Sequence, residues 1–108
     1  MSQQRKRHIE GRPIEELVRC NVSDYVGDAG WVDVERHHYE WRPDDLLVWI
    51  HLKQPLNGPA LIVFCRELSA KMNSLLPIGQ PFSDWLVVVA YAGDTLSRFE
   101  ANDYEASA

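Results

Sequence analysis

The chain has 108 residues, of which 45% are hydrophobic and 25% charged, and its formal net charge is −5. These values are typical of one globular domain and argue against a chain that is disordered throughout. No apolar run approaches the ~20 residues needed to span a bilayer, and no apolar stretch follows the basic N-terminus, so neither a transmembrane helix nor a secretion signal is expected.

Residues 1–12 are predicted to form a flexible basic arm, because they carry a net charge of +3 and almost no apolar side chains. Residues 13–108 carry −8. An acidic body repels phosphate backbones and anionic membranes, so phosphate contacts are expected from the arm alone. The basic side chains that could make them are Arg5, Lys6, Arg7 and Arg12.

The first predicted helix covers about residues 13–21. Pro13 suits the first helical position, and Ile14, Leu17 and Val18 recur on one helical face. Residues 21–28 are rich in turn formers and predict a loop, with a further helical turn as the alternative. Apolar and polar residues alternate over 31–35, as is typical of a strand. The apolar residues then move from even to odd positions, which indicates a bulge or bend at 36–38.

A turn at residues 42–45 leads to a second strand at 46–52, antiparallel to the first. Apolar side chains recur at helical spacing over residues 60–76 and predict the long helix. Strands at 85–91 and 96–101 flank a hairpin turn, in which Gly93 is expected to supply the positive φ of a type II′ turn. Residues 102–108 are expected to be a frayed acidic tail.

The element order α-β-β-α-β-β predicts an α+β fold with a single domain over residues 13–101. We expect a two-layer sandwich, in which a four-stranded, mainly antiparallel sheet carries the one long helix on one face. The strand order is left open. If the strands at 46–52 and 85–91 are parallel neighbours, the crossover between them should be right-handed.

Both central strands are apolar on both faces, because side chains alternate across a strand and few of these are polar. We assign Leu86, Val88 and Ala90 to the face beneath the long helix. The opposite face is then the predicted interaction surface, formed by Leu47, Trp49, Trp85, Val87, Val89 and Tyr91. Three explanations for such a patch stay open: cover by the first helix, a symmetric homodimer, or a groove for another protein or an apolar ligand.

Catalytic motifs are sparse. The histidines His37, His38 and His51 are the basis of a metal-assisted enzyme hypothesis, but a zinc site needs three or four convergent ligands, and His37 and His38 point to opposite faces of a regular strand. No HExxH motif, nucleophile elbow or glycine-rich phosphate loop is present. No cofactor is therefore expected, and catalysis is the disfavoured class.

The leading hypothesis is a small non-catalytic interaction or accessory module that uses an apolar sheet face, as a homodimer or with another protein. A nucleic-acid accessory protein that uses the basic arm is the alternative, and the histidine-centred enzyme is the second alternative. Cys20 and Cys65 lack the spacing of metal or redox motifs. Both lie among apolar residues, so we expect them to be buried free thiols in the reducing cytoplasm, with a disulfide as the alternative.

Overall fold

The computed structural model describes residues 13–37, 45–77, 84–101, 103 and 104. The predicted basic arm, the turn at 42–44, His38 and most of the C-terminal tail lie outside these ranges, and so does the side chain of His37. The elements are α2 (Ile14–Val26), the 3₁₀ turn η1 (Gly27–Ala29), β1 (Gly30–His37), β2 (Asp45–Leu52), α3 (Gly58–Leu75), β3 (Trp85–Tyr91) and β4 (Asp94–Glu100).

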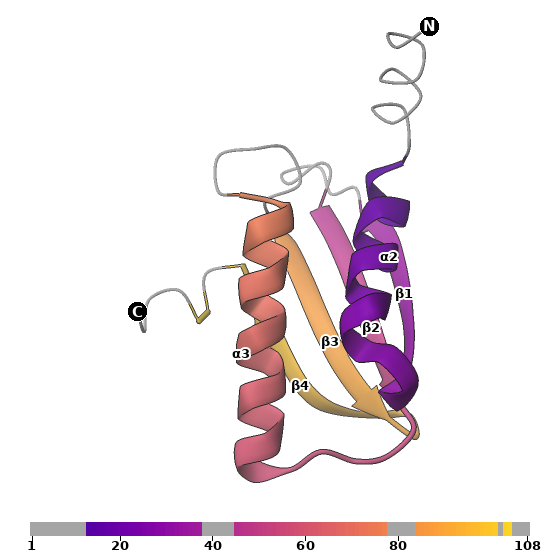
Figure 1. The fold of residues 1–108 in the computed structure, drawn as a ribbon, viewed down its shortest axis with the longest axis vertical. Coiled ribbons are helices and arrows are strands. Elements are labelled where there is room, and N and C mark those ends of the chain that lie inside the picture. The colour runs from indigo at the N-terminus through magenta and orange to yellow at the C-terminus, as the bar shows by residue number, and fades with distance from the viewer. Residues whose placement is uncertain (1–12, 38–44, 78–83, 102, 105–108) are drawn as a thin grey trace, which may run out of the picture.

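The four strands form one sheet in the order β1-β2-β3-β4. The outer pairs, β1 with β2 and β3 with β4, are antiparallel, and the central pair of β2 with β3 is parallel. Helix α3 connects the two parallel strands, and both helices lie on the same side of the sheet (Figure 1). The predicted α+β fold with one mainly antiparallel four-stranded sheet is confirmed.

Helix α2 is longer than predicted, because it continues to Val26 through the segment assigned to a loop. Val18, Val22 and Val26 follow one another at a spacing of four residues and are 0%, 0% and 5% exposed. Residues at this spacing share one helical face, so all three enter the core together. Their burial outweighs the turn-forming tendency of Ser23 and Asp24.

Helix α2 lies beside α3 rather than on the opposite face of the sheet. The Tyr25 hydroxyl donates a hydrogen bond to the Phe64 carbonyl oxygen over 2.9 Å, and the two rings pack with centroids 5.3 Å apart. Val32 of β1 joins the valines of α2 in one hydrophobic core. This arrangement rules out the explanation in which the first helix covers the second sheet face.

The prediction that Trp85, Val87, Val89 and Tyr91 lie on the face away from the long helix was wrong. Trp85, Val87 and Val89 are 2%, 0% and 0% exposed and belong to the core beneath the helices, and Tyr91 packs against that core. The parallel register pairs Val48 with Val87. Alternation shows which residues of one strand share a face, but it does not show which face of β3 lies on the same side of the sheet as a given face of β2, because a long crossover separates the two strands. The two apolar faces of β3 could therefore not be told apart from the sequence.

The hairpin between β3 and β4 also differs from its prediction. Its central residues are Ala92 and Gly93, with φ of 51° and 87°. Positive φ at both central positions is typical of a type I′ turn rather than type II′. The pairing then shifts between Val89 and Ala90, which places Phe99 opposite Val87 and beneath the helices.

Candidate functional site

The side of the sheet that faces away from both helices is the candidate site, and we call it the open face. Its side chains lie in rows that run across the four strands. The first row holds Trp31, His51, Ala90 and Thr95. The second row holds Asp33, Trp49, Val88 and Arg98. The third row holds Glu35, Leu47, Leu86 and Glu100.

Three aromatic rings stack on the half of the open face formed by β1 and β2. The ring centroids of Trp31 and His51 are 5.1 Å apart with an angle of 15° between the planes. The centroids of Trp49 and His51 are 6.2 Å apart with an angle of 13°. His51 is the ring common to both pairs, and we call this set the aromatic stack.

An acidic side chain holds the central ring of the aromatic stack in place. The Nε2 atom of His51 lies 3.1 Å from Oδ2 of Asp33, and the Asp33 side chain is 67% exposed. The ring and Nε2 of His51 are thus both engaged by neighbouring side chains. Among the described residues, no group of three or more His, Cys, Asp or Glu side chains could hold a metal ion, and His38 lies outside them.

The floor of the open face is apolar and largely shielded from water. Leu47, Val88 and Ala90 are 9%, 6% and 7% exposed, while Trp31 at its edge is 56% exposed. The aromatic stack stands beside smaller side chains on β3, because Ala90 and Val88 continue the rows of His51 and Trp49, and Thr95 and Arg98 follow them on β4. The open face therefore has a raised half and a low half.

Of the predicted interaction surface, only Leu47 and Trp49 lie on the open face. Sequence reasoning missed Trp31 and His51 as members of that surface. A signal for Trp31 was present, since Val32 alternates with it and is a natural core residue. Combining that alternation with the antiparallel pairing of the first two strands would have placed Trp31 beside the odd-numbered side chains of β2.

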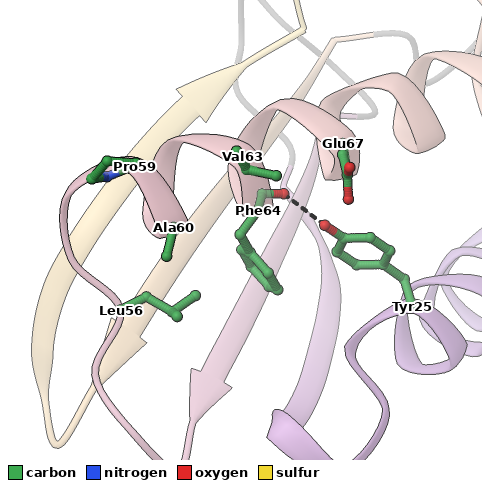
Figure 2. A pocket seen from close by; sticks show the side chains of 7 residues that line it. All are labelled: Tyr25, Leu56, Pro59, Ala60, Val63, Phe64 and Glu67. Atoms are coloured by element: carbon green, nitrogen blue, oxygen red, sulfur yellow. Dashed lines mark hydrogen bonds between the residues drawn. The ribbon is translucent and has the colours of Figure 1, made fainter.

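A second feature is an apolar hollow of about 540 Å³ on the helical layer (Figure 2). It is open to solvent and lies where the end of α2 meets the first turns of α3. Its lining residues are Tyr25, Leu56, Pro59, Ala60, Val63, Phe64 and Glu67. The carboxylate of Glu67 is the one charged group among them.

The Tyr25 phenol at the hollow is a structural group rather than an acid or base. Burial, and then the negative charge of Glu67, raises the pKa of Tyr25 to about 12. The hydroxyl donates to the Phe64 carbonyl, so it joins the two helices. A phenol that stays protonated across the physiological range has no role in proton transfer there.

The buried thiol has no activating neighbour. Cys65 is 1% exposed, and burial raises its pKa, although hydrogen bonds with Ser97 and Tyr104 act in the opposite direction. A reactive cysteine needs an exposed thiolate in an electropositive site. Cys65 therefore lacks the exposure that a reactive thiol requires. Both thiols are free, as expected, but the prediction that Cys20 is buried was wrong, because Cys20 is exposed on α2.

Comparison with known proteins identifies no relative. No protein-family model matches the chain, and neither the curated proteins nor the solved structures contain a significant match. Within the described residues, no helix combines the length and the apolarity that crossing a bilayer requires.

Proposed function

We propose that this chain is a non-catalytic interaction module that binds a protein partner through the open face. One observation carries the proposal: an aromatic stack with an indole that is 56% exposed lies on the sheet face that bears neither α2 nor α3. A solvated face of an antiparallel sheet ordinarily carries polar side chains. Tryptophan is also the residue type most enriched at the energetic centres of protein interfaces.

The distribution of polarity on the open face supports the same function. Its middle is apolar, through Leu47, Trp49 and Val88, while exposed charged groups stand on the outer strands at Asp33 and Arg98. An apolar centre with a polar rim is the usual anatomy of a protein–protein interface. We place the module in the reducing cytoplasm, where the exposed thiol of Cys20 would remain free.

Site-specific photocrosslinking in cells tests the proposal. A photoreactive phenylalanine derivative replaces Trp31 in one variant and Ile62 in a matched control. The two side chains are 56% and 50% exposed, but Ile62 lies on α3 in the other layer.

We expect a discrete crosslinked product from position 31 and none from position 62. Products from position 62 alone, or from neither position, would refute the proposal. Far-UV circular dichroism of both purified variants verifies that the fold is intact.

A further inference from the structure

We infer that the partner on the open face is a second copy of this chain, packed face to face about a twofold axis parallel to the strands. The inference rests on the proposed function and names its partner. It follows from the uneven height of the open face and from the position of its charges.

The aromatic stack forms a ridge. Trp31 and His51 are direct neighbours on adjacent strands, and their ring centroids are 5.1 Å apart, close to the ~4.8 Å spacing between strands. Rings that are parallel at this spacing must stand upright on the sheet, with their edges toward solvent. Trp49 continues the ridge along β2, since its plane lies within 13° of that of His51.

A trough lies beside the ridge, on the half of the face formed by β3 and β4. Ala90 and Thr95 continue the row of His51, and Val88 continues the row of Trp49. These three side chains are shorter than the rings of the ridge, so the surface drops beside it along β3 and at Thr95, and the long side chain of Arg98 bounds this strip on β4. A partner that carries both a ridge and a trough at matching spacing would fill this relief.

A twofold axis parallel to the strands brings ridge and trough together. It places β1 over the partner's β4 and β2 over the partner's β3. Each row keeps its position along the strand direction, so a row of one chain faces the same row of the partner. Trp49 then lies against the partner's Val88, and His51 lies against the partner's Ala90. The reciprocal contacts form by symmetry, as an isologous interface requires.

The other in-plane axis, perpendicular to the strands, is unfavourable. It would place each strand over its own counterpart, so that Trp49 met the partner's Trp49 and ridge met ridge. The acidic β1, with Asp33 and Glu35, would also face a second acidic β1. Steric relief and charge therefore both select the parallel axis.

Charge complementarity supports the chosen arrangement. The second row begins with Asp33 on β1 and ends with Arg98 on β4, so the parallel axis sets Asp33 against the partner's Arg98 twice per dimer. Both residues are exposed. In the third row Glu35 approaches the partner's Glu100, and this repulsion offsets part of the attraction in the second row; all four residues are exposed, so water and salt screen both pairs alike.

A ligand with flat rings fits the open face less well. Proteins that stack nucleobases offer the faces of aromatic rings to solvent, whereas the ridge offers edges. The carboxylates of Asp33, Glu35 and Glu100 also repel phosphate groups.

The size of the sheet predicts a reversible dimer. Four strands at ~4.8 Å spacing and seven residues per strand at ~3.3 Å cover roughly 19 by 23 Å. Two such faces would bury on the order of 1,000 Å², below the roughly 1,200–2,000 Å² of stable specific interfaces and typical of weak, transient ones. We therefore expect dissociation in the micromolar range rather than an obligate dimer.

Sedimentation equilibrium of the full chain, with a charge exchange, tests the inference. D33R and R98D should each weaken dimerisation at least fivefold, because each sets like charges against one another. The double variant D33R/R98D should dimerise more tightly than either single variant; the part of the loss it does not recover reflects the Asp33–His51 contact that D33R removes. Asp33 and Arg98 lie on opposite edge strands, so recovery requires contact between chains. The control E67R makes the same charge change on the helical layer and should leave the dimer unaffected.

Two results would overturn the inference. A double variant that dimerises no more tightly than the single variants would exclude the parallel twofold arrangement. A wild-type chain that stays monomeric to several hundred micromolar would exclude a second copy as the partner. In that case, crosslinks from position 31 to a different protein would leave the proposed function standing, whereas their absence would remove both.

Discussion

Replacing Trp85 by alanine should destabilise the fold several times more than replacing Trp31, although the sequence predicted Trp85 for the exposed surface. Trp85 is 2% exposed and meets Phe99 edge to face, with centroids 6.0 Å apart and an angle of 89°. Truncation of a buried tryptophan typically costs about 3–5 kcal/mol. The expected loss lies toward the lower end, because the buried Nε1 of Trp85 has no hydrogen-bond partner among the residues that the structure describes, and its removal relieves a penalty.

The corresponding loss at Trp31 should be about 1 kcal/mol. This indole is 56% exposed, and its main contact is the stacked ring of His51. An aromatic pair contributes roughly 0.5–1.5 kcal/mol beyond the area it buries. The two losses should thus differ by a factor of about three in a chain whose total stability is on the order of 5–15 kcal/mol.

Urea unfolding of W85A and W31A, followed by far-UV circular dichroism, measures both losses. W85F is included because W85A risks unfolding a chain of this size, and it keeps a ring while it removes the unpartnered N–H. A W31A variant that is destabilised as much as W85A would refute the assignment of faces. Loss of structure in both W85A and W85F, with W31A intact, would agree with it.

Three further predictions concern the turn, the thiols and the link between the helices. Ala92 has a φ of 51°, a left-handed conformation that asparagine adopts more readily than alanine, so A92N should raise the free energy of unfolding by about 1 kcal/mol in the same urea assay. A lower free energy of unfolding would contradict the turn assignment. An aromatic disulfide reagent at pH 8 should label Cys20 rapidly and Cys65 only after unfolding, since Cys65 is 1% exposed and has a raised pKa; rapid labelling of both would be inconsistent with this burial. Y25F should lower stability by about 1 kcal/mol at neutral pH, because the hydrogen bond to Phe64 is lost. The pKa of Tyr25 rises from 10.0 to about 12 on folding, so its contribution is complete below pH 10 and falls as the pH rises through 12; Y25F should lack that part of the pH dependence of urea unfolding.

Elements with strong local signals were predictable from the sequence. The long helix was expected over residues 60–76 and spans Gly58–Leu75, since its apolar side chains recur at helical spacing. The third strand was expected over residues 85–91 and spans Trp85–Tyr91, where an apolar run stands between turn formers. In both, the signal lies within the element itself.

Features that depend on contacts between distant segments were not predictable in this way. The second half of α2 is helical because Val22 and Val26 are buried in the core, and local turn formers gave the opposite indication. The type I′ turn uses Ala92 at a positive φ, which its identity disfavours, so the hairpin register was predicted incorrectly. In each case packing outweighed local preference.

The question of which side chains of β3 point into the core has the largest consequence for the proposed function. Under the predicted parity, Trp49 would have shared its face with Trp85 and Tyr91, so bulky rings would have covered both central strands. The observed register turns Trp85 into the core and leaves Val88 and Ala90 outward. Only this choice produces an open face with a ridge on one half and a trough on the other. Uneven relief of that kind allows a twofold axis to fit the face to a copy of itself, whereas a uniformly bulky face would give no preference between axes.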